Sequence, residues 1–265
     1  MKNKPSKIPR LSLDHVTKEY AKDVYEPSAD TYLLVDAIES DAMTGRLNKC
    51  FTKSDSKTSN AFHIVEIGCG SGVVITSVYH ILQQYVFPTF EKPNYFVSEF
   101  IVTDINAKAL GWSQLTCVQT TLLESLELDQ RIDLLIFNPP YVATELSELE
   151  RAHNERQLAA AWAGGPNGTF WIDILLPCVS TLLSKDGAFY LVTIASNNPY
   201  HILQVMKTQF HLFGTITFFF FFPFQLAKQK IEKFLILNMS VQKRNFVIAN
   251  GKRKGERKKG YPTPF

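Results

Sequence analysis

The stretch AFHIVEIGCGSGVVI, residues 61–75, runs from apolar residues into three closely spaced glycines and back into apolar residues. Its first seven residues are mostly apolar and rich in β-forming types, which predicts a short buried strand. Gly68, Gly70 and Gly72 permit a tight turn and let a ligand approach the backbone closely, and a helix predicted over 71–84 starts directly behind them. The stretch therefore predicts a ligand site at the end of a strand, although glycines that serve only tight packing produce the same pattern.

The spacing of the glycines narrows the class of ligand. A dinucleotide fingerprint, G-x-G-x-x-G, requires glycine or alanine at position 73, where this chain has Val73. The pattern E-x-G-x-G-x-G suits a ligand with an adenosine end and an amino-acid end, because Glu66 can face an ammonium group.

Strands and helices are predicted to alternate along the chain. Residues 26–39 and 169–183 have apolar residues at helical spacing, and Pro27 and Asp30 suit the first position and first turn of the earlier helix. This alternation predicts a parallel sheet with helices on both faces. The further predicted strands are 99–105, 131–137 and 187–194, and the predicted surface loops are 41–60 and 83–95.

Polar residues end three of the predicted strands, at Glu66, Asp104 and Asn138. In an open parallel sheet, ligands bind beyond the carboxyl ends of the strands, so these side chains are expected on one rim. Asp104 is placed to accept hydrogen bonds from both ribose hydroxyls, with a helix N-cap as the alternative role. Asn138-Pro139-Pro140 forms a stiff corner with few backbone donors, since proline has no N–H and a fixed φ.

Composition indicates an intracellular globular protein with a basic end. The 265 residues carry a net charge of +3, but residues 240–265 contribute +7 and leave the body at −4. Four scattered cysteines predict reduced thiols, and with six scattered histidines they offer no zinc spacing, so we expect no metal site. We also predict neither a signal peptide nor a membrane span. The basic end could contact nucleic acid or acidic protein, or remain a solvated tail.

Several motifs together resemble the eukaryotic HemK-type protein glutamine methyltransferases, which use S-adenosylmethionine to methylate the glutamine of the GGQ motif in the class-I release factor. The resemblance covers residues 22–210. The motifs that carry it are DVYEPSADTYLLVDAIE (23–39), EIGCGSGVV (66–74), TDIN (103–106), DLLIFNPPYV (133–142), AAWAGGPNGT (160–169) and FYLVTIASNNP (189–199).

The resemblance implies a class I, Rossmann-like α/β fold: an open, mostly parallel seven-stranded sheet that ends in an antiparallel hairpin. It implies a catalytic and substrate-binding role for Asn138, Pro139, Pro140 and Tyr141. The cofactor contacts that it implies are Thr31, Glu66, Gly68, Gly70, Gly72, Asp104, Leu122 and Asn138. It also implies a small zinc-binding activator subunit as partner, with the enzyme acting in the cytoplasm or also the nucleus.

The chain departs from the family in two places. Residues 109–126 are shorter than the helix and strand expected there, and Thr121 stands where the family has an aspartate that binds the adenine amino group. Segments 214–221 and 233–238 fit the terminal hairpin, but the phenylalanine run and the basic tail have no counterpart, and the phenylalanine run could derive from a retained intron. We therefore predict an N-terminal tail over 1–22, a methyltransferase domain over 23–238 and a basic tail over 239–265.

The sequence leaves three alternatives open. The same pocket could accept a lysine amine. An Asn-Pro-Pro-Tyr corner also suits the exocyclic amine of adenine in nucleic acid, although the acidic body and the lack of a target-reading domain argue against it. The shortened 109–126 segment could leave a binding subunit with weakened catalysis.

Overall fold

The structure is a computed structural model that describes residues 24–51, 61–90, 97–106, 116–123, 126, 128–155, 158–218 and 234–241. The predicted N-terminal tail, most of the basic tail and Phe219–Phe222 of the phenylalanine run lie outside these residues. The last described strand continues to Val241, three residues past the end predicted for the domain.

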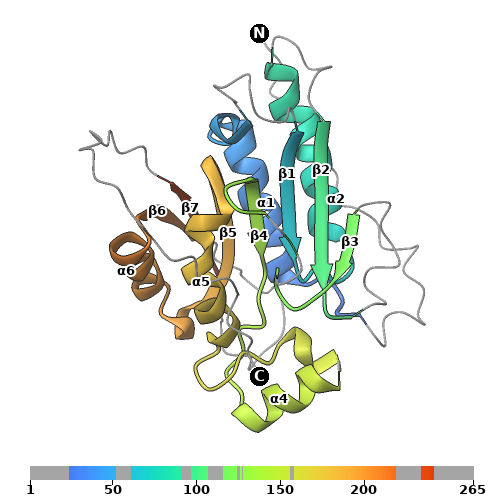
Figure 1. The fold of residues 1–265 in the computed structure, drawn as a ribbon, viewed down its shortest axis with the longest axis vertical. Coiled ribbons are helices and arrows are strands. Elements are labelled where there is room, and N and C mark those ends of the chain that lie inside the picture. The colour runs from blue at the N-terminus through green and yellow to red at the C-terminus, as the bar shows by residue number, and fades with distance from the viewer. Residues whose placement is uncertain are drawn as a thin grey trace, which may run out of the picture.

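One seven-stranded sheet forms the centre of the described chain, with strand order β3-β2-β1-β4-β5-β7-β6 (Figure 1). The first five strands in this order run parallel, and β7 pairs antiparallel with both β5 and β6. This arrangement confirms the predicted sheet and its antiparallel terminal hairpin. The strands are β1 (Ala61–Ile67), β2 (Val97–Asp104), β3 (Thr116–Gln119), β4 (Ile132–Phe137), β5 (Leu183–Ile194), β6 (Leu212–Phe218) and β7 (Phe234–Val241).

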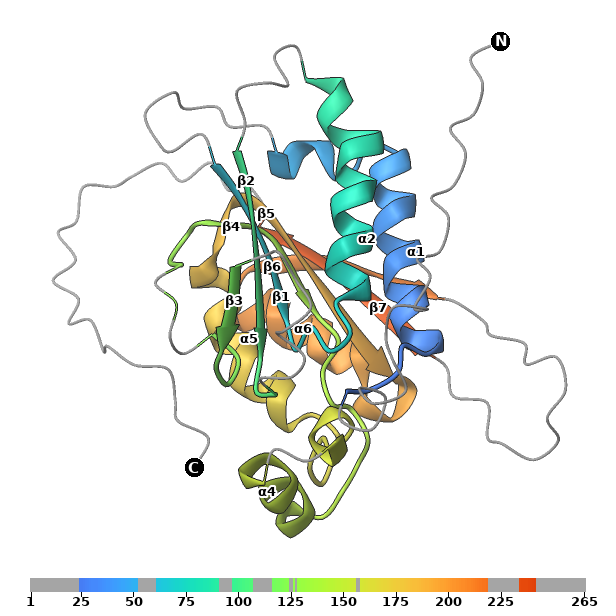
Figure 2. The same ribbon diagram turned by 90° about the vertical axis from the view of Figure 1, so that its right-hand side faces the viewer.

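Helices cover both faces of the sheet, as the alternation of strands and helices predicted (Figure 2). Helices α1 (Ala29–Met43) and α2 (Val73–Ile81) pack on one face, and α5 (Phe170–Leu182) and α6 (Pro199–Gln209) pack on the other. Helix α4 (Leu146–Asn154) lies beyond the carboxyl ends of the strands (Figure 1). None of the described helices combines the length and apolar character that crossing a membrane requires.

The central strands are buried on both faces, which explains why their sequences are continuously apolar. Successive residues of β1 alternate between the two cores, since Ile64 packs with α1 and α2 whereas Val65 packs with α5. The same alternation holds in β4, where Leu134 and Leu135 face opposite cores. A strand whose residues are all apolar is predicted to be buried on both faces of the sheet. Its sequence does not show which helix packs against which face.

The boundaries of α1 and α2 differ from those predicted from the sequence. Helix α1 begins at Ala29 with Ser28 as its N-cap, so Pro27 lies outside the helix, while Asp30 is in the first turn as expected. The predicted loop over 83–95 is wrong at its start, because α2 continues into a π-helical turn over Leu82–Val86 that buries three residues. The predicted loop over 41–60 likewise loses its first three residues to α1.

A buried carboxyl group joins the end of α1 to the C-terminal hairpin. Asp41 Oδ2 accepts hydrogen bonds from the Tyr190 hydroxyl of β5 (2.7 Å) and from Asn238 Nδ2 of β7 (2.6 Å). Its Oδ1 accepts from Arg46 Nη1 at 2.9 Å. Burial raises the pKa of the Tyr190 phenol, and the neighbouring Asp41 raises it further. The three side chains therefore anchor β7, which follows a long stretch of undescribed chain, to α1.

We expect Asp41→Ala to lower the free energy of unfolding by about 1–3 kcal/mol, because it leaves the buried Tyr190 hydroxyl without an acceptor, whereas Asn238 Nδ2 keeps the Tyr190 oxygen as an acceptor. Urea unfolding followed by circular dichroism measures this loss. The matched control is Arg46→Ala, whose side chain is 68% exposed and whose loss should cost less than about 1 kcal/mol. Equal midpoints for wild type and Asp41→Ala would contradict the anchoring role.

Candidate active site

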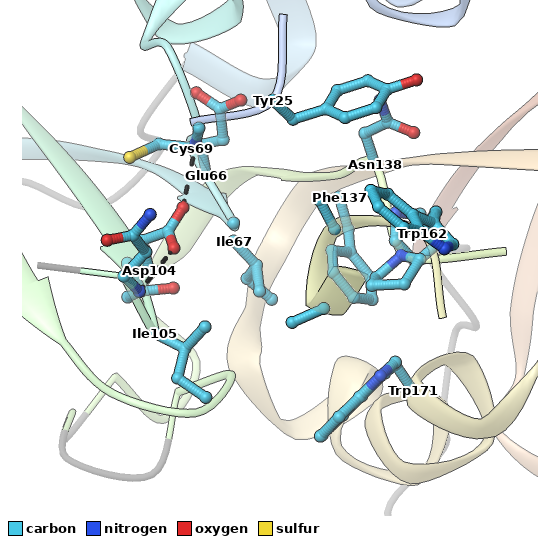
Figure 3. Close-up of a pocket in the computed structure, with 18 of the residues that line it drawn as sticks. Tyr25, Glu66, Ile67, Cys69, Asp104, Ile105, Phe137, Asn138, Trp162 and Trp171 are labelled. Carbon is cyan, nitrogen blue, oxygen red and sulfur yellow. Dashed lines mark hydrogen bonds between the residues drawn. The ribbon is translucent and has the colours of Figure 1, made fainter. Parts of the chain in front are cut away.

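A pocket opens at the carboxyl ends of β1, β2 and β4, between the start of α1 and the segment that follows α4 (Figure 3). It brings together nearly all the residues predicted for the site. Gly72 is the exception, because it is the N-cap of α2 and does not line the pocket. The predicted residues in its lining are Thr31, Glu66, Gly68, Gly70, Asp104, Leu122, Asn138, Pro139, Pro140 and Tyr141.

The glycine turn after β1 has the backbone geometry that the sequence predicted. Gly68, Gly70 and Gly72 adopt φ values of +67°, +49° and +74°, which residues with a Cβ rarely adopt. A Cβ added at any of the three would meet no atom within 4 Å, so there is open space beside the turn. The turn is tied to β2 because the Gly68 and Cys69 N–H groups donate to Thr103 O at 2.8 and 3.1 Å.

Glu66 and Asp104 place a buried and a half-buried carboxyl group next to this turn. Glu66 is 3% exposed, and its Oε2 accepts the Ile75 N–H of α2 at 2.9 Å. Burial raises the pKa of Glu66 well above that of a free carboxyl group; the hydrogen bond from Ile75 opposes this shift, and nearby Asp104 adds to it. Asp104 accepts the Gly70 and Asn106 N–H groups at 2.9 and 2.8 Å, and burial raises its pKa as well.

The Asn-Pro-Pro-Tyr corner, residues 138–141, is bound to the first turn of α1. Asn138 Nδ2 and the Tyr141 hydroxyl both donate to Asp30 Oδ2, at 3.0 and 2.9 Å. Asn138 Oδ1 is buried and has no hydrogen-bond partner among the described residues. Because Asp30 was assigned only a helix-start role from the sequence, its part in the site is one that sequence reasoning missed.

The glycine-rich segment 163–168 supports the corner from behind. The Val142 N–H donates to Trp162 O at 3.0 Å, and Gly164 N–H donates to Val142 O at 2.8 Å, so the two segments form a short parallel bridge. At Gly168, which has φ +67°, an added Cβ would lie 2.1 Å from Tyr141 O. Only glycine allows this close approach of the two backbones.

Asn197 completes the support of the corner. It is buried, and its Nδ2 donates to the carbonyls of Tyr141, Asn167 and Gly168 at 3.1–3.2 Å. Its Oδ1 accepts the Ile194 N–H at 3.0 Å. The resemblance motif over 189–199 included Asn197, but its role as the link between three backbone segments depends on contacts that no local pattern reveals.

The structure also shows the surroundings of three other positions singled out from the sequence: Thr31, Thr121 and Leu122. Thr31 Oγ1 accepts the N–H of Ser28 at 3.3 Å, so its hydroxyl also serves in capping α1. Thr121 and Leu122 follow β3 and line the pocket, which shows that the shortened segment still reaches the site. Although this segment is shorter than the family pattern, it forms the strand β3, which pairs with β2. Leu122 has a left-handed backbone with φ +52°, a strained conformation of the kind found at functional sites.

Aromatic residues that the sequence did not single out form the opposite wall. Trp162 and Trp171 lie across the pocket from Glu66 and Asp104, and Tyr25 lies close to Asn138 (Figure 3). The His153 ring stacks on Trp171 with centroids 4.9 Å apart. Tryptophan at 162 was visible in the motif AAWAGGPNGT, but Trp171 and Tyr25 had no pattern of their own.

The charge of the pocket selects for a cationic ligand. Three carboxyl groups, those of Asp30, Glu66 and Asp104, belong to its described lining, and that lining contains no lysine or arginine. A sulfonium or ammonium group is attracted by such a site, whereas a phosphate would be repelled. On the Asn138 side, the pocket offers hydrogen-bond acceptors to an incoming N–H group. The arrangement suits transfer of a group from a cationic donor to a nitrogen.

Curated relatives agree with this chemistry. Methyltransferase HEMK2 of Homo sapiens is 36% identical over 206 residues, which cover 74% of this chain and 83% of that protein. The eRF1 methyltransferase catalytic subunit mtq2 of Schizosaccharomyces pombe is 33% identical over 209 residues, 72% of this chain and 80% of that one. The release factor glutamine methyltransferase of Moorella thermoacetica is 29% identical over 167 residues, 62% of this chain and 52% of that one.

A solved structure supports the fold. The E. cuniculi Mtq2–Trm112 complex, described as responsible for methylation of the eRF1 translation termination factor, matches with a TM-score of 0.52 at 21% identity over 83% of this chain and 99% of that one. No protein-family model matches the sequence. With 33–36% identity to eukaryotic relatives over most of both proteins, this chain belongs to the HEMK2–Mtq2 family of methyltransferases.

Proposed function

We propose that this enzyme transfers the methyl group of S-adenosylmethionine to the side-chain amide of the GGQ glutamine in a class-I translation release factor. The substrate follows from relatives that are named as eRF1 and release factor glutamine methyltransferases. Release factors act on ribosomes, so we infer that the enzyme works in the cytoplasm. A lysine amine remains the alternative acceptor.

The residues present fit S-adenosylmethionine at the glycine-turn side of the pocket. Open space lies beside Gly68 and Gly70, and the carboxyl groups of Glu66 and Asp104 would hold its ammonium and ribose hydroxyl groups. When bound, this cofactor supplies a methyl group on a sulfonium, which needs no metal to leave. Leu122 and Thr31 would contact its adenine and amino-acid ends.

The side of the pocket lined by Asn138 would bind the group that accepts the methyl, and we call it the acceptor side. It must overcome the poor nucleophilicity of an amide nitrogen, whose lone pair is delocalised. Asn138 Oδ1 and the Pro139 carbonyl would accept the two N–H bonds of the target amide, which fixes the nitrogen and raises its electron density. The C–N bond forms as the C–S bond breaks, and the nitrogen then releases a proton to solvent. Alignment of the two reactants is the main contribution, which reaches about 7–11 kcal/mol in favourable cases.

The single observation that carries this proposal is the unpaired Asn138 Oδ1. It is a buried acceptor in the pocket lining, across from the carboxyl groups of Glu66 and Asp104. Buried polar atoms in folded proteins nearly always have a partner, so an unpaired one calls for a bound group. An N–H donor on the substrate supplies that partner.

We also propose that the enzyme works as a heterodimer with a small zinc-binding activator subunit. The E. cuniculi relative is a two-subunit complex, Mtq2 with Trm112. In the present chain β3 is an edge strand of four residues with a partly exposed surface, and such edges pair readily with another chain.

For Asn138→Ala, we expect turnover to fall by at least about 10²-fold, because one transition-state hydrogen-bond acceptor is lost. The dissociation constant of S-adenosylmethionine should stay within a few-fold. Methyl transfer to purified release factor and calorimetry with the cofactor measure the two quantities. Asn154→Ala, at the exposed end of α4, is the control. Near-normal turnover of Asn138→Ala would show that the Asn-Pro-Pro-Tyr corner has only a structural role.

For Thr121→Asp, we expect tighter cofactor binding. A hydrogen bond to a charged acceptor contributes about 1.5–3 kcal/mol, which corresponds to roughly 10- to 150-fold in affinity. The wild type, with a neutral hydroxyl at this position, should bind S-adenosylmethionine weakly but measurably. Calorimetric titration of both proteins tests this, and Thr116→Asp, at the exposed start of β3 and outside the pocket lining, serves as the control. Equal dissociation constants for wild type and Thr121→Asp would place residue 121 away from the adenine.

For the activator, we expect the chain expressed alone to be poorly soluble, because an open sheet edge promotes aggregation. Co-expression should yield a one-to-one complex, which size-exclusion chromatography with light scattering would detect. A well-behaved, fully active monomer at micromolar concentration would refute the need for a partner.

A further inference from the structure

Asp30 lines the pocket and is bonded to the Asn-Pro-Pro-Tyr corner. It belongs to the first turn of α1 and is 2% exposed. Its Oδ2 accepts from Asn138 Nδ2 and the Tyr141 hydroxyl, and its Oδ1 accepts from the hydroxyl groups of Ser28 and Thr31. One buried carboxyl group thus collects four donors from two segments that are more than a hundred residues apart.

These contacts determine which way the Asn138 amide faces. The two ends of an asparagine amide have almost the same shape, so packing alone cannot distinguish Oδ1 from Nδ2. An ionised carboxyl group only accepts hydrogen bonds, and it therefore turns Nδ2 toward itself and Oδ1 away. The atom that remains without a partner is Oδ1.

We propose that Asp30 is a positioning residue for methyl transfer, which holds Asn138 in the single amide orientation that presents an acceptor to the target nitrogen. This inference rests on the proposed function and specifies how the site selects its acceptor. The Tyr141 hydroxyl bound to the same oxygen keeps the carboxyl group from rotating away.

The charge behind Asn138 also acts on the reaction itself. The target nitrogen becomes more positive as the methyl group arrives, so its N–H bonds to Oδ1 strengthen in the transition state. A carboxyl group bonded to Nδ2 polarises the amide and makes Oδ1 a stronger acceptor, because hydrogen bonds in a chain reinforce one another. The contribution of Asp30 should therefore appear in kcat more than in KM.

The same geometry excludes some acceptors. A glutamine amide, with two N–H donors on one nitrogen, can satisfy both Oδ1 and the Pro139 carbonyl. A glutamate in its place offers only acceptors and a negative charge, which would face Asn138 Oδ1 with Asp30 behind it. A release factor with glutamate in its GGQ motif should therefore not inhibit methylation of the natural protein.

Asp30→Asn tests the proposal with little change in volume. The new amide can donate as well as accept, so Asn138 is free to turn its Nδ2 toward the pocket. We expect kcat to fall by about 10- to 100-fold, while KM for the release factor and the dissociation constant of S-adenosylmethionine change by no more than a few-fold. Asp36→Asn, on the same helix but outside the pocket lining, should behave as wild type.

Exchanging the amide and the carboxyl group between positions 30 and 138 distinguishes a positioning role of Asp30 from a purely structural one. Asn138→Asp alone would place two carboxyl groups in contact, and we expect at least about a 100-fold loss of kcat. The double variant Asp30→Asn with Asn138→Asp restores one amide and one carboxyl group, and still presents an oxygen to the pocket. It should be at least about tenfold more active than Asn138→Asp alone. A double variant no better than the single one overturns the proposal.

A nuclear magnetic resonance measurement tests the orientation without substrate. The side-chain NH₂ signals of Asn138, assigned by their absence in Asn138→Ala, should exchange slowly in wild type and faster in Asp30→Asn. Unchanged exchange, or a normal kcat for Asp30→Asn, contradicts the positioning role. If wild type is inactive on the release factor but the exchange rates differ as expected, the substrate assignment fails and the orientation of Asn138 by Asp30 stands.

Discussion

The reversal of strand order between β1 and β4 is the constraint on which the site depends. The chain leaves β1 toward the face covered by α1 and α2, and it leaves β4 toward the face covered by α5. The two paths diverge beyond the carboxyl ends of these neighbouring strands, and ligands bind at such a point in open α/β sheets. Glu66, Asp104 and Asn138 end the three strands that meet there.

Helix α1 is positioned by a carboxyl group at each end. Asp30, in its first turn, binds the Asn-Pro-Pro-Tyr corner, and Asp41, near its last turn, binds Tyr190 and Asn238 of the sheet. Both groups are buried, and their hydrogen bonds compensate the cost of burying them. A helix held in this way links the C-terminal hairpin to the acceptor side of the pocket, so the hairpin contributes to the geometry of the site from a distance.

The two sides of the pocket, the glycine turn and the Asn-Pro-Pro-Tyr corner, differ in the polar groups that they present to a ligand. The glycine turn provides open space beside the buried carboxyl group of Glu66 and the half-buried one of Asp104, which suits a cationic donor. The corner provides acceptors whose orientation is set by Asp30, and it is supported from behind by Gly168 and Asn197. Because both residues contact the backbone of the corner at close range, substitutions away from the reacting atoms can still displace the acceptor.

The sequence by itself determined the parallel sheet with helices on both faces, the glycine turn and the strand-end residues, because each depends on neighbours along the chain: a run of apolar residues, three glycines, two prolines. It did not determine the start of α1, since Pro27 fits a helix N-terminus but Ser28 caps it. Only the tertiary structure showed that Asp30 orients Asn138, that β3 forms and brings Thr121 to the pocket, and that Trp171 lines it. These are contacts between segments distant in sequence, and a hydrogen bond across 108 residues leaves no periodic pattern by which it could be predicted.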